Sequence, residues 1–586
     1  MSVYRAPVEE MLFVMNEIGD LNDIAALPGY EDASPDLIAH ILEEAGKLGT
    51  EVLDPINASG DQQGCTLENG VVRTPDGFKE AYSQFIAGGW NSLPFDPEFG
   101  GQGLPKLVST GVSEIWHAAN MAFGLCPLLT GGAVELLSIH GSEDLKAVYL
   151  ENMISGVWNG TMNLTEPQAG SDLARVRTKA VRDGQHYRIS GQKIFITYGE
   201  HDFTDNIIHL VLARTPDAPE GIKGISLFLV PKFLVNPDGS LGDRNDLRCG
   251  SIEHKMGINA SPTAVMLFGE NEGAQGYLIG EENRGIEYMF TMMNNARLAV
   301  GLEGVAIAER AYQRARSFAE DRVQGRDSAS ASKEPVSIIQ HPDVRRMLLD
   351  MRAQTEAVRA LAYWVASRLD IAHRHPDPET ARKAQSYVDL LTPVVKAWST
   401  DTGVDVANTG VQVHGGMGFI EETGAAQHLR DARIAPIYEG TNGIQAIDLA
   451  GRKIAREGGE TMTLLIAEMR QSIADMGHPH ARLTAAIDAL EQATNWIVSS
   501  FAENPVAALA GAVPYLRLTG ITVGGWLMVR TLEASKRDAE KFPLFAKRKQ
   551  ASVSFYARHF LVQAPGLADT VVHGSSVIAD TPQELV

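Results

Sequence analysis

The sequence predicts an α+β protein in which helical domains precede and follow a central antiparallel β-barrel along the chain. Three observations lead to this prediction. Apolar residues recur every three or four positions up to about residue 160 and again from Gly285, whereas between these regions they alternate. A glycine pair, Gly458-Gly459, then interrupts the helical pattern before it resumes. The predicted domains are 1–160 (N-terminal helical), 161–280 (middle β), 281–455 (helical bundle) and 456–586 (additional C-terminal helical).

The first region is helical by its spacing and by its start and stop signals. Asp36 to Leu48 and Thr110 to His117 carry apolar residues three and four positions apart. Ser142 favours a helix N-cap for the segment that follows it, and Gly156 can end that helix. We therefore expect mostly helices before the β region.

The middle region contains short strands joined by turns. Asp183-Gly184 is a dipeptide typical of tight hairpins, and it separates the strand candidates 178–181 and 186–189. No helical segment alternates with the strands, so the sheet or barrel that they form is predicted to be antiparallel. Further strand candidates, rich in Val, Ile, Leu and Phe, are 208–213, 225–230, 264–268 and 275–279.

Longer helical segments follow the β region. The Ser-, Ala- and Lys-containing stretch 326–335 predicts an exposed loop between two of them. The helices predicted for the bundle are 303–320, 343–369, 378–391 and 399–408. Those predicted beyond the glycine pair are 461–476, 481–502, 523–539 and 551–562.

The composition limits the possible functions. With 44% hydrophobic and 21% charged residues over 586 positions, the chain is typical of a soluble globular protein. The net charge of −22 argues against a nucleic-acid partner, because neutralising phosphates requires an excess of Lys and Arg. Cys65, Cys126 and Cys249 are far apart and support neither a disulfide framework nor a zinc site. We therefore expect a cytoplasmic protein without a metal.

Neither a leader nor a membrane span is predicted. The N-terminus has no apolar stretch behind a basic head. Leu518 to Val529, taken as the most apolar window, is twelve residues long and too short to cross about 30 Å of hydrocarbon. We expect it to be a buried helix.

One carboxylate late in the chain has the surroundings of a general base. Glu439 follows the apolar run Ile434–Tyr438, which can exclude water and raise its pKa, and it precedes Gly440, where the backbone can approach a ligand. Such a carboxylate can abstract a proton from carbon. The alternative is structural, because Thr441 or Asn442 can cap a following helix whose positive end favours a nearby carboxylate.

Glu439 belongs to the last of four motifs spread along the chain. They are Leu164-Thr-Glu-Pro-Gln-Ala-Gly-Ser-Asp172, Gly191-Gln-Lys-Ile-Phe-Ile-Thr197, Val411-Gln-Val-His-Gly-Gly-Met-Gly-Phe419 and Tyr438-Glu-Gly-Thr441. In this order they resemble the flavin loop, the strand behind the flavin ring, the loop on the distal half of the flavin and the catalytic segment of the acyl-CoA dehydrogenase family. The resemblance covers residues 40–450, and 451–586 resembles the tail of long bacterial members.

The resemblance implies FAD as the cofactor. It is held outside a Rossmann fold, since no Gly-x-Gly-x-x-Gly follows a predicted strand. Arg322 and Gln324 match residues that approach FAD from another subunit, which implies a homo-oligomer, with a dimer favoured. The implied cofactor-binding residues are Met162, Leu164, Thr165, Phe195, Thr197, Arg322, Gln324, Gln412, Gly415, Gly416 and Thr441. The implied substrate-binding residues are Ser171, Asn294, Arg297, Tyr438 and Gly440.

The implied reaction is α,β-dehydrogenation of an acyl-CoA thioester to the trans-2-enoyl-CoA. Glu439 would remove the α-proton while a hydride leaves the β-carbon for flavin N5, and the Glu439 N–H would stabilise the carbonyl oxygen. The resemblance also implies an electron-transfer flavoprotein as acceptor, in catabolism of fatty acids or dimethylsulfoniopropionate. Candidate substrates are 3-methylmercaptopropionyl-CoA and short- or medium-chain acyl-CoA. Two alternatives are an acyl-CoA oxidase that uses dioxygen and a non-catalytic acyl-CoA-binding homologue.

Three positions depart from patterns common in the family. Ala296 occupies the position directly before Arg297 where some members carry their base, so that role is assigned to Glu439. Phe195 replaces a frequent Trp, and Gly443 replaces a bulkier polar residue. The last two changes can reshape the acyl pocket without removing a catalytic group.

Individual candidates also have structural interpretations. Thr165 and Thr197 suit strands, and Arg297 and Arg322 on helices are commonly solvated or salt-bridged. His414 is expected to be packed rather than to act as a second base. Core filling, or the lining of an acyl tunnel that tolerates sulfur, is expected for Met289, Met292 and Met293.

Overall fold

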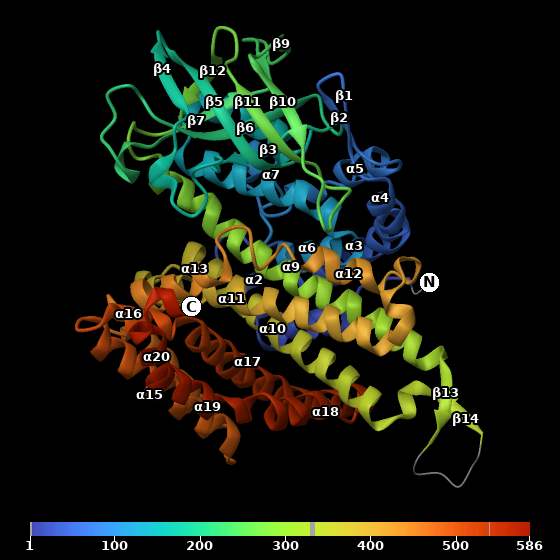
Figure 1. The fold of residues 1–586 in the computed structure, drawn as a ribbon. Helices are drawn as coiled ribbons and strands as arrows, with labels where there is room; N and C mark the ends of the chain where they lie inside the picture. The colour runs from blue at the N-terminus through green and yellow to red at the C-terminus, as the bar shows by residue number, and fades with distance from the viewer. Residues whose placement is uncertain (1–2, 328–333, 538) are drawn as a thin grey trace. The chain divides into compact units, whose positions relative to one another are not determined.

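The structure is a computed structural model that describes residues 3–327, 334–537 and 539–586. The chain divides into two compact units. Met1–Gly46, Pro105–Ala118 and Arg297–Val586 form one, here called the helical unit, and Lys47–Leu104 and Ala119–Ala296 form the other, here called the β unit. Figure 1 shows the elements of both.

The β unit contains the six predicted strands and also six that were not predicted. Asp183 ends one of them and Gly184, with φ 64°, forms the hairpin turn. The strands are β1 (Thr66–Glu68), β2 (Val71–Arg73), β3 (Trp158–Asn163), β4 (Lys179–Asp183), β5 (His186–Thr197), β6 (Asn206–Ala213), β7 (Ser226–Pro231), β8 (Phe233–Val235), β9 (Leu241–Arg244), β10 (Leu247–Ile252), β11 (Thr263–Phe268) and β12 (Ala274–Leu278). The predicted ones are β4, β5, β6, β7, β11 and β12, and those not predicted are β1, β2, β3, β8, β9 and β10. The helices are α4 (Asn57–Gln63), α5 (Phe78–Ala87), α7 (Met121–His140) and α8 (Glu143–Ile154).

These strands close into the predicted barrel. β4, β5, β12, β7 and β6 are joined by antiparallel pairs in this order. The circuit closes where Ala180 donates its N–H to the Arg214 carbonyl at 2.8 Å and the Arg214 N–H donates to the Thr178 carbonyl at 2.9 Å. β5 also continues as far as Thr197 and pairs there with β11, so one strand serves both the barrel and its extension. Closure removes unpaired strand edges at this point.

The sheet is not antiparallel throughout, and the bridge between Lys179 and Arg214 that closes the barrel is itself parallel. β3 runs parallel to β6, which makes the sheet mixed. β3 was not predicted, because the side chains that it buries are polar: the Thr161 hydroxyl lies 2.7 Å from His209 Nδ1, and Asn163 Nδ2 donates to Thr161 at 2.8 Å. A strand with a hydrogen-bonded polar interior lacks the apolar alternation that identifies strands in a sequence.

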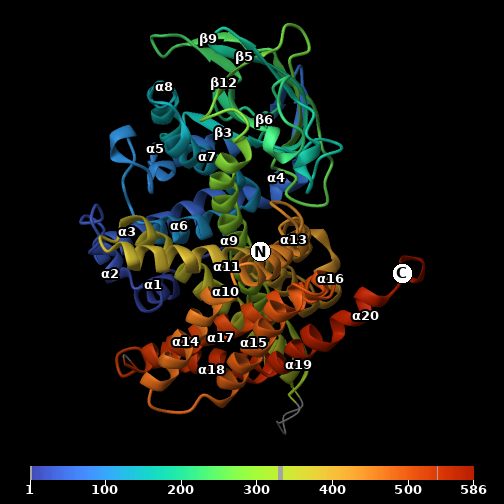
Figure 2. The same cartoon turned by 90° about the vertical axis from the view of Figure 1, so that its left-hand side faces the viewer.

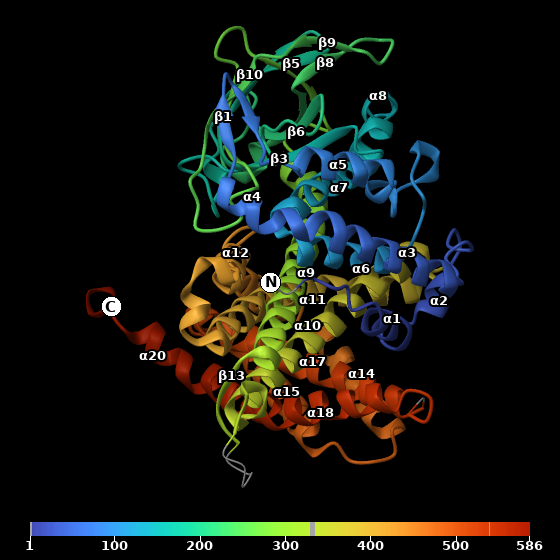
Figure 3. The same cartoon turned by 90° about the vertical axis from the view of Figure 1, so that its right-hand side faces the viewer.

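Helix α7 packs across β3, as Figure 3 shows. Gly160 permits this contact, because a Cβ there would lie 2.4 Å from the Cβ of Ala133. Within the described residues, α7 is the one helix long and apolar enough to cross a membrane, with a mean hydropathy of 1.6, but 67% of that window is buried inside the protein. The segment that meets the length and hydropathy criteria for a membrane span is therefore α7 rather than 518–529. Its burial is typical of a core helix.

The helical unit is built on long helices. A short hairpin, β13 (Val323–Arg326) and β14 (Pro335–Ser337), flanks the loop that was predicted at 326–335. Residues 328–333 of that loop lie outside the described part of the chain. The helices wholly or mostly in this unit are α1 (Val8–Glu17), α2 (Leu21–Ala25), α3 (Pro35–Leu48), α6 (Lys106–Ala119), α9 (Gly285–Asp321), α10 (Pro342–Arg374), α11 (Pro378–His414), α12 (Ala425–Ala432), α13 (Asn442–Ile447), α14 (Glu460–Asp475), α15 (Ala481–Phe501), α16 (Pro505–Ala510), α17 (Ala512–Arg537), α18 (Pro543–His559), α19 (Ala564–Asp569) and α20 (Ser575–Asp580).

Helix α11 is continuous where two helices, 378–391 and 399–408, were predicted. Pro393 lies inside it and is buried. A proline removes one main-chain hydrogen bond and usually kinks or ends a helix, which is why a break was expected there. Extensive packing against α10 holds the helix together through this position.

The predicted C-terminal helices form one layer with α17 at its centre. Gly458 and Gly459, at φ 77° and 75°, precede α14 in the left-handed conformation that glycine adopts without strain. α17 packs against α10, α11, α15, α18 and α19, and Figure 2 shows it among them. Gly520 and Gly524 allow the ring of Trp398 to approach, since a Cβ would lie 2.5 and 2.4 Å from it. The stretch 518–529 is buried in this helix, as predicted.

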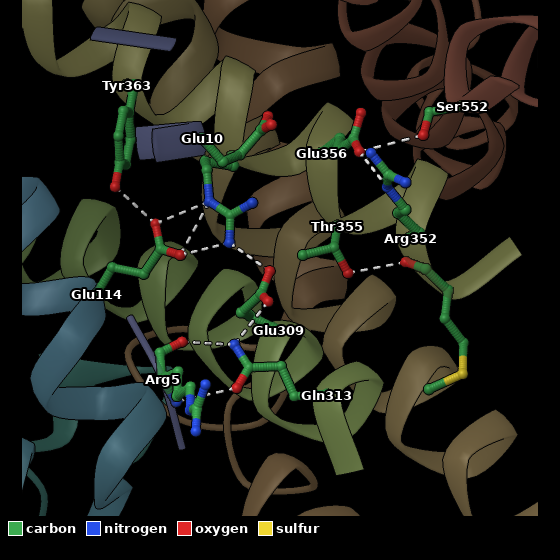
Figure 4. Close-up of polar contacts among 12 residues, drawn as sticks. Arg5, Glu10, Glu114, Glu309, Gln313, Arg352, Thr355, Glu356, Tyr363 and Ser552 are labelled. Atoms are coloured by element: carbon green, nitrogen blue, oxygen red, sulfur yellow. Dashed lines mark hydrogen bonds and ion pairs between the residues drawn. The ribbon is translucent and has the colours of Figure 1, made fainter. Parts of the chain in front are cut away.

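Buried charges connect several helices of this unit (Figure 4). Arg359 of α10 donates to Glu114 of α6 and to Glu309 of α9, both at 2.7 Å, and it is 1% exposed. The Tyr363 hydroxyl also donates to Glu114, at 2.7 Å. Charges without water must be paired, so this network fixes how α6, α9 and α10 pack.

A second set of buried charges connects α1, near the N-terminus, with α10 and with α18 in the C-terminal region. Lys549 of α18 pairs with Glu10 of α1 and, at 3.2 Å, with Glu356 of α10. Ser552 donates to Glu356 at 3.1 Å, and Arg352 pairs with the same carboxylate at 2.6 Å. Figure 4 shows Arg352 and Ser552 converging on Glu356.

Candidate active site

Glu439 lies in a tight turn between α12 and α13. Its backbone is left-handed, with φ 55°, a conformation that costs a residue other than glycine about 1–3 kcal/mol. Gly440 follows at φ 83°, and Asn442 closes the turn by donating its N–H to the Pro436 carbonyl at 3.0 Å. Strain of this kind persists only where the surroundings hold it, and it is often found at functional positions.

A buried lysine of α11 supports the turn. Lys396 has no exposed surface, and its Nζ donates to the Gly440 carbonyl and to Asn442 Oδ1, both at 2.8 Å. Asn442 in turn donates to the Ala397 carbonyl at 3.0 Å. Burial lowers the pKa of Lys396 to about 8, although nearby carboxyls, Glu439 first among them, oppose that shift. The main chain after Glu439 is thus anchored to α11.

The Glu439 carboxyl is placed so that it titrates near neutral pH. Burial raises the pKa of Glu439 to about 7, against the opposing effects of Arg297 and Lys396. Arg297 is 7% exposed, and burial lowers the pKa of its guanidinium. The whole residue at position 439 is half-buried, so a ligand can reach it. A carboxylate with these properties suits proton transfer at neutral pH.

The structural interpretation of this segment is also correct. Thr441 caps α13, because its hydroxyl accepts the Ile444 N–H at 3.2 Å. Gln445, 1% exposed, donates from Nε2 to the Glu439 carbonyl at 3.2 Å. The start of the helix therefore orients the peptide that carries the candidate base, and the two interpretations are compatible.

In the β unit, the first two motifs come together. Thr165 accepts the Ile194 N–H on its carbonyl at 2.9 Å, and the Leu164 carbonyl accepts a bond from Lys193 Nζ at 3.0 Å. Met162 is half-buried at the end of β3, just before this loop. The loop after β3 is therefore fixed to β5.

Glu166 anchors the same loop. It accepts bonds from Lys193 Nζ at 2.8 Å, from the Thr178 hydroxyl at 2.6 Å and from the Arg177 N–H at 2.7 Å. Burial alone would raise the pKa of Glu166, but Lys193 and these hydrogen bonds lower it to about 2. Lys193 has no exposed surface, and burial lowers its pKa to about 8 despite the opposing effect of Glu166.

Phe195 and Thr197 flank the buried Ile196 at the end of β5. The register of the pairing with β11 shifts between Lys193 and Ile196, which marks a local irregularity at Phe195. Phe195 is 59% exposed and has φ 60°, so a large aromatic ring is presented at the surface by a strained backbone. Such an arrangement suits a surface that a planar ligand covers.

In the helical unit, the third motif ends α11. His414 is packed, as expected: it is 6% exposed, lies 2.7 Å from the Gly410 carbonyl and stacks on Phe318 at 4.4 Å between ring centroids. Gly415 and Gly416 follow, and a Cβ on either would meet no atom within 4 Å. Gln412 beside them is exposed.

The remaining predicted residues stay at the surface. Arg322 and Gln324 are exposed at the end of α9 and in β13, and His341 lies 2.7 Å from the Gln324 carbonyl. Ser171 and Asn294 are exposed in the β unit. The structure thus brings together Arg297, Tyr438, Glu439, Gly440 and Thr441 in the helical unit, and Met162, Leu164, Thr165, Phe195 and Thr197 in the β unit.

Sequence reasoning missed the residues that support both clusters. Lys396 stands within Val394-Val395-Lys396-Ala397-Trp398, and Glu303 within an apolar helix segment. A charge inside an otherwise apolar run is the signal that identifies such residues, since buried charges need partners. The same signal applies to Lys193.

The described residues also contain one group with metal-ligand geometry. The ligand atoms of His478, His480 and Glu533 lie within 4.8 Å of one another in the helical unit. Lys536 Nζ donates to the Glu533 carboxylate at 2.7 Å, so a cation already neutralises it. This group lies outside the two clusters described above.

Each cluster, taken within its own unit, has features that suit FAD. The open space beside Gly415 and Gly416 leaves room for a ligand against bare backbone, where a side chain would intrude. The exposed ring of Phe195 offers an apolar face for an aromatic system. The donors and acceptors of Thr165 and Thr197 lie on elements fixed by buried hydrogen bonds, as a cofactor site requires.

Comparisons with known proteins identify the family. The chain matches "Acyl-CoA dehydrogenase, N-terminal domain" over residues 41–157, the "middle domain" over 161–270 and the "C-terminal domain" over 283–454. Residues 465–582 match "Acetyl-CoA dehydrogenase C-terminal like". The four matches together follow the order of the predicted regions.

Whole proteins match as well. A 3-methylmercaptopropionyl-CoA dehydrogenase of Ruegeria pomeroyi is 49% identical over 570 residues, 96% of each chain. A butyryl-CoA dehydrogenase of Syntrophomonas wolfei is 35% identical over 99% of each. The crystal structure of an acyl-CoA dehydrogenase complexed with FAD from Bacillus anthracis has a TM-score of 0.73 at 21% identity, covering 96% of this chain and 91% of that one.

The chain belongs to the acyl-CoA dehydrogenase family. It is an FAD-dependent oxidoreductase that dehydrogenates acyl-CoA thioesters, and the predicted fold with its additional C-terminal helical region is confirmed.

Proposed function

We propose that Glu439 is the catalytic base that removes the α-proton of the acyl-CoA thioester. The observation that supports this most strongly is its left-handed, anchored turn, which holds a carboxyl of pKa about 7 near Arg297 and Lys396. Protein atoms keep water from this carboxyl, so its ionised form is a stronger base than an exposed glutamate. The Glu439 N–H donates to the thioester carbonyl oxygen as charge develops there.

The proposed substrate-binding residues come from both units of the chain. Arg297 binds the acyl-CoA by charge-assisted hydrogen bonds, and Ser171 and Asn294 contribute polar contacts along the coenzyme A part. Tyr438 and Gly440 border the acyl chain. The missing Cβ of Gly440 lets the turn close against Gln445, whose Nε2 would lie 2.7 Å from that Cβ. The nucleotide end of the thioester thereby helps to position the carbons at Glu439.

FAD is held by residues of the four motifs. Leu164 and Thr165 contact the edge of its ring, Phe195 and Thr197 its face, and Gly415-Gly416 its distal half, together with Met162, Gln412, Thr441 and, from a second subunit, Arg322 and Gln324. Bound FAD supplies the acceptor for the hydride of the β-carbon. The chain's contribution is to orient the β-carbon and to exclude water.

The proposed substrate is 3-methylmercaptopropionyl-CoA. The 49% identical relative that carries this name supports the choice. A short straight-chain acyl-CoA is the second candidate, because the 35% identical relative is named for butyryl-CoA. Anaerobic flavin reduction with both thioesters distinguishes them: a higher kcat/KM for butyryl-CoA would contradict the first assignment.

The cellular setting follows the family. We propose a cytoplasmic homodimer that passes electrons to an electron-transfer flavoprotein, in catabolism of fatty acids or of dimethylsulfoniopropionate. The four-domain division at residues 160, 280 and 455 belongs to the same proposal. Light scattering for mass, and turnover with and without the flavoprotein, test these statements.

The decisive experiment replaces the base. Glu439→Gln keeps the shape of the side chain but cannot take the proton, so it should retain FAD and bleach the flavin at least about a thousandfold more slowly in the absence of oxygen. Glu422→Gln, an exposed position, is the matched control. A normal bleaching rate in Glu439→Gln would refute the proposed role.

A further inference from the structure

A second carboxyl lies next to the catalytic segment. Glu303 of α9 has no exposed surface, and its Oε2 accepts the hydroxyl of Tyr438, the residue directly before the proposed base. Among the described residues its Oε1 has no hydrogen-bond partner. Glu303 follows Ala296 by seven positions, which places it on the same face of α9 two turns further along.

The charges around Glu303 do not compensate an ionised carboxylate. Glu439 faces it from the turn, and Lys396 faces it from α11, but Lys396 Nζ is already bonded to Gly440 and Asn442. Within the described part of the chain, the one hydrogen bond to the Glu303 carboxyl comes from the neutral Tyr438 hydroxyl. An ionised carboxylate without a paired cation is strongly disfavoured inside a protein.

The charged groups near Glu439 complete this cluster. Arg297 faces Glu439 from α9 and Lys396 faces it from α11. Asp448 and Arg452 act on Arg297 from the segment after α13, and Asp401 acts on Lys396 from within α11. Two cations therefore lie close to one base, and a second negative charge at Glu303 would compete with the base for one of them, Lys396.

We propose that Glu303 is a positioning residue that stays in its acid form during turnover, holds the Tyr438 hydroxyl and keeps negative charge away from Glu439. The proposal rests on the role assigned to Glu439 above. In its acid form, Glu303 gives the Tyr438 hydroxyl a fixed acceptor and leaves the charge of Lys396 to the base and the developing enolate. No covalent or redox step is assigned to it.

The pH dependence gives this role a direction. Burial, aided by nearby Glu439, raises the pKa of Glu303 to about 8, against the opposing effects of the Tyr438 hydrogen bond and of Lys396. Glu303 is therefore neutral at pH 7 and ionises as the pH rises through about 8. Ionisation places a negative charge beside the base and the forming enolate, so flavin reduction should slow on the alkaline side. The two carboxyls titrate as a coupled pair, and the observed limits belong to the pair.

Glu303→Gln tests the proposal, because glutamine has the shape of the protonated acid and cannot ionise. We expect a flavin-reduction rate within about twofold of the unmodified enzyme at pH 7 and no decline at alkaline pH. Glu303→Leu removes the acceptor of the Tyr438 hydroxyl and should lower the rate about tenfold at every pH. Glu320→Gln, exposed on the same helix, is the control and should keep the alkaline decline.

A second measurement does not depend on turnover. The infrared C=O band of a protonated carboxyl should be present in the full-length protein at pH 7, disappear as the pH rises, and be reduced in Glu303→Gln. An unchanged alkaline decline in Glu303→Gln would overturn the proposal and assign the decline to Lys396, whose pKa is also about 8. Loss of activity in Glu303→Gln at all pH values would equally overturn it, because a carboxylate would then be required.

These outcomes are separable from those for the base. If Glu439→Gln bleaches normally, the proposed function itself fails. If Glu439→Gln is inactive and Glu303→Gln has an unaltered pH profile, only the role of Glu303 fails.

Discussion

Lys396 Nζ and the carbonyl oxygen of Gly440 lie 2.8 Å apart, so a side chain of α11 holds the main chain immediately after Glu439. The bond is buried, and the lysine also reaches Asn442 at the start of α13. The position of the base is thus set by a helix rather than by the turn alone, and a helix is a more rigid support than a loop.

Lys396→Met should therefore slow flavin reduction about tenfold to a hundredfold, because it leaves the Gly440 carbonyl and Asn442 Oδ1 without their donor and frees the strained turn to relax. FAD content should be retained. Stopped-flow reduction without oxygen measures the effect, and Lys383→Met, at an exposed position of the same helix, is the control. Equal flavin-reduction rates for the two variants would show that the turn keeps its conformation without Lys396.

The acidic side of the pH profile should report Glu439. Its pKa is raised from the ordinary value of 4.5 to about 7, so the base is protonated and inactive below that pH. The value of kcat/KM should fall about tenfold per pH unit below the apparent pKa of the free enzyme. A profile that stays level down to pH 5 would exclude Glu439 as the titrating base.

Lys193→Met should destabilise the β unit. It leaves Glu166 as a buried carboxylate without its cation, which costs about 3–5 kcal/mol. Lower thermal stability and loss of FAD are expected. The double variant Lys193→Met/Glu166→Gln should recover most of the stability, because no buried charge remains, whereas exposed Lys223→Met should have no effect. A double variant no more stable than the single one would contradict the ion-pair explanation.

The same pair predicts a dependence of stability on acid. The pKa of Glu166 is lowered to about 2 in the folded state, so its stabilising contribution is complete above pH 4.5 and is lost as the pH falls toward 2. Denaturant unfolding at several pH values measures this. The slope of stability against pH in this window should be smaller in the double variant.

Gly524→Ala should weaken the contact between α17 and α11. Its Cβ would lie 2.4 Å from the Trp398 ring, an overlap that costs about 1–3 kcal/mol when a packed core must adjust. Gly566→Ala is the matched control, because a Cβ there meets no atom within 4 Å. Thermal unfolding should separate the two variants, and an unchanged midpoint for Gly524→Ala would show that the ring can move aside.

Much of the fold could be predicted because local pattern and tertiary structure agree. β11 carries the alternation that its half-buried position demands, β7 is an apolar run buried along its whole length, and α17 is buried throughout its apolar window. Prediction failed where packing overrides a local signal. Pro393 did not end α11, and β3 was hidden by polar side chains that bond to one another inside the protein.

The same distinction decides which residues of the candidate site could be predicted. Glu439 could be found because its apolar run, its glycine and the motif around it are contiguous. Lys396, Glu303 and Glu166 could not, since their role depends on partners far away in the chain that only folding brings within hydrogen-bond distance. A sequence shows that a charge stands in an apolar run but does not show what neutralises it.

The ion pairs of Lys549 have a consequence for shortening the chain. A variant that ended before α18 would lack Lys549, the cation that pairs with Glu10 and with Glu356. Both carboxylates are buried, so water would not replace the lost ion pairs. Such a truncation would expose apolar surface and would also leave unpaired negative charge in the protein interior. A shortened chain that lacks this tail would therefore need neutral residues in place of the two glutamates.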